Sequence, residues 1–151
     1  MTPGAPEPPT LRQLVGRELG PTAWREIDQA RVDAFAAATD DPQWIHVDPE
    51  RAAAGPFGTT IAHGFLTLSL LVSMLAEVLA VDGYALTVNY GLNRVRFPAP
   101  VPVGSRIRAR FRVDSVSEVT GGDQAFVSAT VESDGGEKPV CVAELVLRFV
   151  R

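Results

Sequence analysis

The segment from Phe65 to Val81 constrains the fold most, because it is apolar on nearly every face that a helix could present. Its only polar or charged side chains are Thr67, Ser69, Ser73 and Glu77. The segment reaches only the lower limit of membrane-spanning length, and these polar residues favour a buried helix instead. A helix that is hydrophobic all round must be covered by other parts of the protein.

The second half of the chain can supply this cover, since it consists of strand-forming runs separated by turns. Tyr84–Phe97 is rich in strand formers, and Gly91 marks a possible bulge within it. Arg106–Val113 alternates arginine with apolar residues, which is typical of a strand with one buried face and one wet face. Further turns are expected at 121–123 and 134–136, and further strands at 125–132 and 140–150.

The first half is predicted to be mainly helical. Helices are expected at Thr10–Leu19, at 29–38 with Asp28 as N-cap, and from Pro49 with Asp48 as N-cap. Trp24–Ile27 is expected to form a short strand. Together these patterns predict an α+β fold in which an antiparallel sheet wraps around the helix at about 65–81. Residues 1–9 are expected to form a flexible tail and residues 10–151 one domain.

Composition limits the classes of function. The net charge is −4, whereas nucleic-acid-binding domains are usually basic, so we expect no nucleic-acid partner. The single cysteine, Cys141, excludes an intramolecular disulfide and lies among apolar residues, where a buried packing role is favoured over a nucleophile. Neither a signal peptide nor a membrane span is recognisable, so a cytoplasmic location is expected.

Two short stretches could carry chemistry. Asp41 and His46 stand five residues apart across a turn, where a carboxylate and an imidazole could hold one water and take its proton. The alternative is that Asp41 caps the turn and His46 is a satisfied polar group. Gly64 opens the apolar helix, so its free amide and the helix dipole could stabilise a developing oxyanion. The alternative there is tight packing of the helix start.

Three blocks of sequence resemble the MaoC-like dehydratases, the (R)-specific enoyl-CoA hydratases of the hotdog fold. They are Asp-Pro-Gln-Trp-Ile-His at Asp41–His46 with its continuation to Ala52, Gly58–Phe65, and Asn89–Ile107, and they occur in the family's order. The resemblance covers roughly residues 10–150. One departure stands out: the family often has Asn-Pro just before the residue that precedes the histidine, whereas here proline directly follows Asp41.

The resemblance implies a fold, an assembly and a reaction. It implies a single hotdog domain and a homodimer whose sheets join edge to edge. Asp41 and His46 match the catalytic residues of the family, and Gly64 matches the glycine whose amide polarises the thioester carbonyl. The implied reaction is the reversible hydration of a trans-2-enoyl-CoA to an (R)-3-hydroxyacyl-CoA, as part of fatty acid metabolism. No metal or redox cofactor is implied, because coenzyme A belongs to the substrate.

Other residues are candidates for contact with the substrate, each with a plainer alternative. His63 could lie near the thioester or only pack at the helix start, and as a metal pair with His46 it lacks supporting ligands. Asn89 and Tyr90 could line a tunnel or occupy an ordinary strand face. Arg94 and Arg96 could meet the phosphates of coenzyme A, because guanidinium groups suit phosphate geometry.

Three other functions stay open at the level of sequence. Hotdog thioesterases commonly place a carboxylate on or near the central helix, and the only acid within 65–81 is Glu77, far from Gly64. A non-catalytic subunit that binds acyl thioesters is the second alternative, which the joint presence of Asp41, His46 and Gly64 disfavours. The third is a nodulation-type or polyketide-associated protein of the same fold that acts on a carrier-protein substrate. The sequence separates neither coenzyme A from carrier-protein thioesters nor one acyl length from another.

Overall fold

The computed structural model describes residues 8–151. The predicted tail at 1–9 therefore lies almost wholly outside the described residues. Helical segments and strands follow one another along the chain as η1 (Leu11–Leu14), β1 (Glu18–Leu19), β2 (Arg25–Glu26), α1 (Gln29–Thr39), α2 (Trp44–Val47), α3 (Pro49–Ala53), α4 (Gly64–Val78), β3 (Leu86–Arg96), β4 (Arg106–Val119), β5 (Gly122–Ser133) and β6 (Cys141–Val150).

The strands form one antiparallel sheet in the order β1-β4-β5-β6-β3, with β2 also paired to β4. Successive strands β4, β5 and β6 are neighbours, whereas β3 crosses to the far side of β6 and ends the sheet. The register of β3 shifts between Asn89 and Gly91, which confirms the bulge expected there. In β4 the arginines lie on the outer face while Ile107, Ala109, Phe111 and Val113 are buried, as the alternation predicts.

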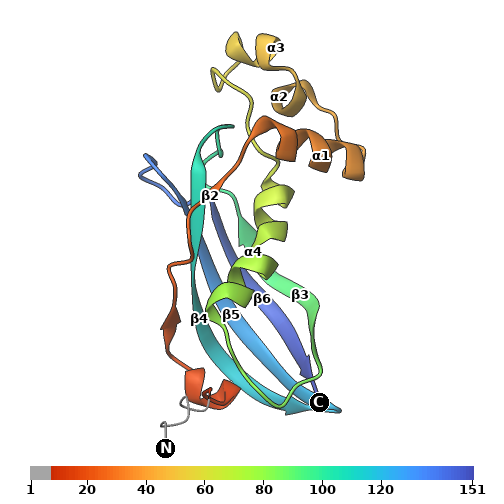
Figure 1. The fold of residues 1–151 in the computed structure, drawn as a ribbon, viewed down its shortest axis with the longest axis vertical. Coiled ribbons are helices and arrows are strands. Elements are labelled where there is room, and N and C mark those ends of the chain that lie inside the picture. The colour runs from red at the N-terminus through yellow and green to blue at the C-terminus, as the bar shows by residue number, and fades with distance from the viewer. Residues whose placement is uncertain (1–7) are drawn as a thin grey trace, which may run out of the picture.

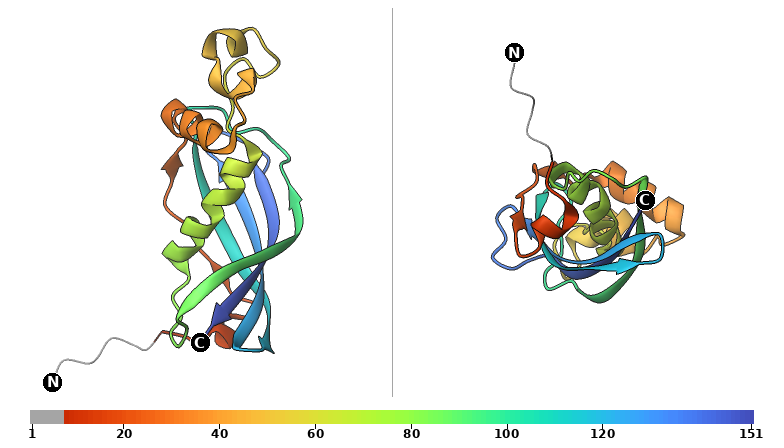
Figure 2. Two further views of the ribbon diagram at one scale, coloured as in Figure 1. Left: turned by 90° about the vertical axis from the view of Figure 1, so that its right-hand side faces the viewer. Right: turned by 90° about the horizontal axis from the view of Figure 1, so that it is seen from below.

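Helix α4 lies along the concave side of this curved sheet (Figure 1). Seen from below, the sheet bends around the helix without enclosing it (Figure 2). Leu71 and Met74 are fully buried against the sheet, but Phe65 and Val72, also on α4, are 68% and 53% exposed. The expected α+β architecture, with an antiparallel sheet wrapped around the helix, is confirmed, and part of the helix surface stays exposed in the single chain.

The three short helices α1, α2 and α3 gather beyond the N-terminal end of α4, at the top of Figure 1. Asp28 caps α1 by accepting from the Arg31 amide at 2.8 Å, and Asp48 caps α3 by accepting from the Arg51 amide at 3.0 Å. Both caps were predicted, because Asp commonly accepts from the amides of a first helical turn. The caps set where each helix begins, and so where the segment between α1 and α3 turns.

The helix predicted at Thr10–Leu19 is wrong. Only Leu11–Leu14 is helical, and Glu18–Leu19 pairs instead with β4. Gly16 has a φ of +80°, a left-handed conformation that ends the helical turn. Glu18–Leu19 provides hydrogen-bond partners for backbone groups at the edge of β4, which a longer helix would have left unpaired. Tertiary pairing therefore overrides the local apolar spacing. Among residues 8–151, no helix is both long and apolar enough to cross a membrane.

Candidate active site

The segment that carries Asp41 leaves α1 through a sharp reversal. Asp40 adopts a left-handed conformation with φ 55°, and the Asp41 amide donates to the carbonyl of Ala36 at 3.0 Å. Such a left-handed residue closes a helix and turns the chain away from its axis. The side chain of Asp41 emerges beyond this turn with half of its surface exposed, so it can reach solvent and neighbouring groups together.

His46 lies on the one-turn helix α2 and is buried. Its Nδ1 lies 2.7 Å from the carbonyl oxygen of Ile61. Because a carbonyl can only accept, Nδ1 carries the proton and Nε2 of the neutral ring keeps its lone pair. The burial of the ring lowers the pKa of His46 below its ordinary value of 6.5, although the bond to Ile61 opposes this shift. The ring is thus held as a neutral base with one free nitrogen.

His63 is stacked against His46. The ring centroids are 3.8 Å apart with an interplanar angle of 22°, and Phe35 contacts His63 with a centroid distance of 4.9 Å. The Nε2 of His63 donates to the backbone carbonyl of Asp41 at 3.0 Å and lies 3.8 Å from the Asp41 carboxylate. One ligand-type atom from each of Asp41, His46 and His63 lies within 4.8 Å of the others.

This cluster has the residue types of a metal site but not the orientation. Each imidazole uses one nitrogen on a carbonyl oxygen. A metal ion lies close to the plane of each imidazole that binds it, whereas these two rings are stacked, with centroids 3.8 Å apart and 22° between their planes, so their nitrogens do not converge on one such point. The arrangement therefore fits proton chemistry better than chelation, and the absence of a metal stays a prediction.

Gly64 is the first residue of α4 and lies beside His46. His63 is the N-cap but makes no side-chain bond to the first turn, and its carbonyl accepts from the amides of Leu66 and Thr67. The amide of Gly64 is among the first-turn donors that have no partner within a helix. A cavity of about 300 Å³, which we call the His46 cavity, is lined by both His46 and Gly64, by Thr67, and otherwise by apolar groups, including Phe57 and Phe97.

The absence of a side chain at Gly64 matters for this cavity. A Cβ there would lie 3.0 Å from the ring of Phe97, which is tighter than ordinary contact. Phe97 is 41% exposed and packs edge-on against Phe65 with a centroid distance of 6.4 Å. A glycine at this position therefore lets an aromatic wall of the cavity approach the helix terminus closely.

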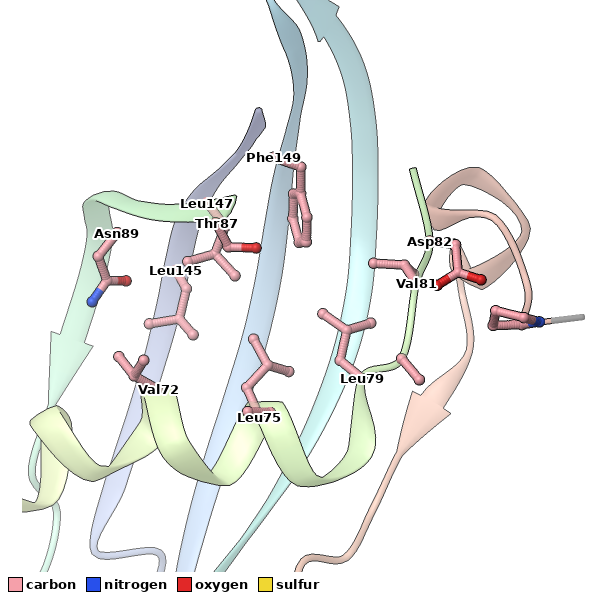
Figure 3. Close-up of a pocket in the computed structure, with 13 residues that line it drawn as sticks. Val72, Leu75, Leu79, Val81, Asp82, Thr87, Asn89, Leu145, Leu147 and Phe149 are labelled. Atoms are coloured by element: carbon pink, nitrogen blue, oxygen red, sulfur yellow. The ribbon is translucent and has the colours of Figure 1, made fainter. Parts of the chain in front are cut away.

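A second cavity of about 440 Å³, which we call the apolar cavity, lies between the later turns of α4 and strands β3 and β6. Figure 3 shows Val72, Leu75 and Leu79 facing Leu145 and Leu147 across it. Asn89 and Thr87 of β3 are among its few polar lining residues, with Asp82 at one end. Helix α4 thus presents its N-terminus to one cavity and its C-terminal half to another.

The structure brings only some of the predicted substrate residues together. Asn89 faces the apolar cavity. Tyr90 stacks with Arg148 at 3.6 Å, and Arg94 and Arg96 line a groove with Ser128, Thr130 and Glu144. Those partners lie on the face of the sheet away from α4, so these three residues are not gathered with His46 in one chain. Their role in binding coenzyme A stays a prediction.

Two supporting residues were not recognised from the sequence. Gln29, at the start of α1, donates to the backbone carbonyl of His46 at 2.7 Å and accepts from the hydroxyl of buried Thr60 at 2.6 Å. Trp44 of α2 packs so closely on Gly55 that a Cβ there would lie 2.9 Å from its ring, and Arg51 covers the ring at 4.4 Å. No local pattern marks these contacts, since each joins segments that only folding brings together.

Comparisons with known proteins agree with this geometry. Residues 11–141 match the family described as MaoC like domain. The 3-hydroxyacyl-thioester dehydratase Z of Mycobacterium tuberculosis (strain ATCC 25618 / H37Rv) is 56% identical over 141 residues, or 93% of each chain. Nodulation protein N of Rhizobium leguminosarum bv. viciae is 46% identical over 136 residues, covering 87% of this chain and 84% of that protein.

Solved structures give the same result. The (R)-hydratase from A. caviae involved in PHA biosynthesis superposes with a TM-score of 0.74 at 28% identity, covering 89% of this chain and 96% of that one. A curved antiparallel sheet around a helix whose N-terminus faces an acid and a histidine defines a hotdog protein of the dehydratase class. The chain belongs to the MaoC-like dehydratase family.

Proposed function

We propose that this protein adds water reversibly to trans-2-enoyl thioesters, giving (R)-3-hydroxyacyl thioesters. The observation that carries the proposal is that His46, with a free Nε2, and the helix-terminal amide of Gly64 share one largely apolar cavity beside the carboxylate of Asp41. The dehydratase names of the 56% identical relatives and the (R)-hydratase name of the structural neighbour support the reaction class.

The water would be held between two acceptors. The Asp41 carboxylate and the unprotonated Nε2 of His46 can each accept one of its hydrogens, which leaves an oxygen lone pair for C3 of the substrate. As the C3–O bond forms, the π bond between C2 and C3 breaks. The proton taken by the Asp41–His46 pair is returned to C2, so that the net change is the addition of one water.

The thioester carbonyl would lie on the Gly64 amide. Addition at C3 moves electron density through C2 onto the carbonyl oxygen, which becomes an enolate in the transition state. The free N–H and the dipole of the 15-residue helix α4 both stabilise negative charge at that point. Largely apolar walls, including Phe57 and Phe97, exclude bulk water and so strengthen this interaction.

The acyl tail would extend toward the apolar cavity. Residues 64 and 72 of α4 are separated by about 12 Å along the helix axis at 1.5 Å per residue. The side chains of Val72, Leu75, Leu145 and Leu147 provide the hydrocarbon surface that a tail needs (Figure 3). The size of this cavity, about 440 Å³, leaves room for several carbons beyond C3.

A second copy of this chain is the expected partner. Every residue of β3 is at least partly exposed, and β3 pairs on one side only, with β6. Long unpaired edge strands with apolar side chains, here Leu86, Val88 and Tyr90, invite pairing with another sheet. A homodimer joined along β3 would give a particle of twice the 16.2 kDa chain mass, which light scattering measures directly.

The decisive experiment is a hydration assay with trans-2-enoyl-CoA substrates of increasing chain length, following the loss of absorbance of the conjugated thioester. Chiral analysis of the product should give the (R) alcohol. Asp41→Asn should lower turnover by about 10² or more, because an amide is a poor proton acceptor. Enoyl thioesters of a carrier protein, assayed in parallel, decide which thioester is preferred.

Asp40→Asn is the matched control for Asp41→Asn. It makes the same chemical change one residue away, and asparagine tolerates the left-handed conformation of Asp40. We expect this variant to hydrate normally. Near-normal hydration by a folded Asp41→Asn protein would instead contradict the assignment of the site.

The thioesterase alternative gains no support from the central helix. Glu77, its only acid, is paired with Arg25 and accepts from the amide of Ala23 at 3.3 Å. The carboxylate is therefore engaged at the end of α4 away from Gly64. Incubation with a saturated acyl-CoA should release no free thiol, whereas a non-catalytic binding subunit would show neither thiol release nor hydration.

A further inference from the structure

The position of His63 does not match the role in substrate binding that the sequence suggested. Its side chain is buried, with 3% of its surface exposed, and it is not among the residues that line either cavity. One ring face covers His46 and Phe35 packs against the ring from another element, α1. A substrate in the His46 cavity would meet His46 and Gly64 rather than His63.

The contacts of His63 instead reach both residues of the proposed acid–base pair. Its Nε2–H donates to the backbone carbonyl of Asp41 at 3.0 Å, across 22 residues of sequence. Its ring covers that of His46 at 3.8 Å, while the Nδ1–H of His46 is bound to Ile61. One side chain therefore restrains where Asp41 leaves its turn and how the ring of His46 is oriented.

This arrangement has a cost that packing alone would avoid. The Nδ1 of His63 is buried and has no hydrogen-bond partner among residues 8–151. An unsatisfied buried polar atom destabilises a fold, and an apolar ring of similar shape would be free of that penalty. The side chain uses its other nitrogen on Asp41, so the donor at Nε2 is the feature that an apolar ring could not replace.

We propose that His63 is a positioning residue of the hydratase: it fixes the spacing between the Asp41 carboxylate and the Nε2 of His46 so that both accept from one water. The inference rests on the proposed function and assigns His63 no contact with substrate. A displacement of about 1 Å between catalytic groups can cost up to about 10²-fold in rate. Its loss should therefore lower kcat and leave KM nearly unchanged.

Three variants separate the two contacts. His63→Ala removes both the donor and the ring. His63→Gln places an amide nitrogen near the position of Nε2 and so restores the bond to Asp41, and His63→Phe restores the ring against His46 but not the donor. We expect His63→Ala to lower kcat by roughly 10-fold or more, with KM within about threefold of wild type, and each of the other two variants to recover part of the loss.

An NMR measurement makes the test independent of turnover. The ¹⁵N shifts of His46 report which ring nitrogen carries the proton. We expect a single Nδ1–H form in the wild type and a mixture of the two tautomers in His63→Ala, with the Nδ1–H form restored in His63→Phe. If the wild type hydrates no enoyl thioester, the proposed function fails, while these shifts still decide whether His63 orients His46.

Tyr84→Phe, far from the site, serves as the stability control: it should lower the melting temperature without lowering kcat. Either of two results would overturn the proposal. One is a kcat for His63→Gln and His63→Phe equal to that of wild type, with unaltered shifts of His46; this comparison holds even if His63→Ala does not fold. The other is a rise in KM of tenfold or more at unchanged kcat, which would make His63 a substrate contact.

Discussion

Two buried polar clusters lie at opposite ends of the molecule and are built differently. At the end away from α1, Asp123 is 2% exposed and accepts from Arg12 at 2.8 Å, from Tyr84 at 2.8 Å and from Arg151 at 2.6 Å. At the other end, His46 and His63 are also buried, but each uses a single nitrogen on a backbone carbonyl. One cluster is saturated with partners and the other keeps free nitrogens.

The difference separates a structural polar cluster from a reactive one. The Tyr84 hydrogen bond and the two arginines lower the pKa of Asp123, so that its charge is stabilised within the fold. Burial is the main cause that raises the pKa of Tyr84, and the bond to Asp123 adds to it. In the His46 cluster, burial lowers the pKa of the base instead, and among the described residues 8–151 no hydrogen bond occupies its Nε2. A ring nitrogen with a free lone pair, rather than burial, distinguishes the reactive cluster.

The comparison predicts its largest effect on stability at Asp123. Asp123→Ala leaves Tyr84 and two arginines without their shared acceptor. Breaking a buried ion pair costs about 3–5 kcal/mol, and we expect roughly 2–4 here because both arginines are half exposed. Chemical denaturation measures this loss, and the fraction that remains folded should hydrate substrate at the wild-type rate. A slower folded fraction would show that the two clusters are coupled.

His46→Ala should produce the opposite pattern. Removing the free Nε2 takes away one acceptor for the attacking water, so turnover should fall by about 10²-fold. The unfolding free energy should change less than in Asp123→Ala, since only one hydrogen bond of His46, to Ile61, is lost. Measuring both kcat and the denaturation midpoint of His46→Ala and Asp123→Ala tests this contrast. Equal losses of stability in the two variants would remove the distinction between the clusters.

Tyr84→Phe tests the saturated cluster more gently. It deletes one of three donors to Asp123 and keeps the ring that packs on Phe149 at 5.3 Å. We expect a loss of about 1.5–3 kcal/mol, the usual value for a hydrogen bond to a charged group. Thermal unfolding measures it, and Arg151→Met, which removes another donor at the same oxygen, is a suitable companion. An unchanged midpoint in Tyr84→Phe would mean that the arginines alone satisfy Asp123.

The smallest effect concerns pH. The folded-state pKa of His46 lies below 6.5, so the unfolded chain binds the proton more readily. The stabilising contribution of neutral His46 is thus complete above pH 6.5 and is lost as the pH falls toward the folded-state pKa. For Asp123, whose pKa is also lowered, the contribution is complete above about 3.8 and is lost below it. The difference in unfolding free energy between wild type and His46→Gln should therefore become smaller as the pH falls from 6.5 to 5. Over the same pH range, the difference in unfolding free energy between wild type and Asp123→Asn should stay constant.

Much of the scaffold could be predicted because it follows from local patterns. The alternation in 106–113, the bulge at Gly91 and the caps at Asp28 and Asp48 each involve residues close in sequence. The prediction that Cys141 is buried is also confirmed, and burial raises the pKa of its thiol to about 11. The error at Thr10–Leu19 arose where pairing with distant β4 outweighed local spacing.

The site was only partly predictable. Spacing and family resemblance selected Asp41, His46 and Gly64, which the structure gathers at the start of α4. The stacking of His63 on His46 and the bonds of Gln29 could not be predicted, since tertiary packing brings together residues that are 17 or, for Gln29 and Thr60, 31 positions apart. The exposed side of α4 could not be predicted either, because apolar composition does not say whether a sheet or a second chain covers it.

The contact between Trp44 and Gly55 bears on how this sequence can vary. Trp44 stands inside the segment where the chain departs from the usual family motif, and its ring leaves no room for a Cβ at position 55. An alanine at 55 would need a smaller side chain at 44, and a smaller side chain at 44 would leave a gap under Arg51. The two positions are therefore expected to change as a pair among relatives, so that grafting the usual motif into this protein requires an exchange at residue 55 as well.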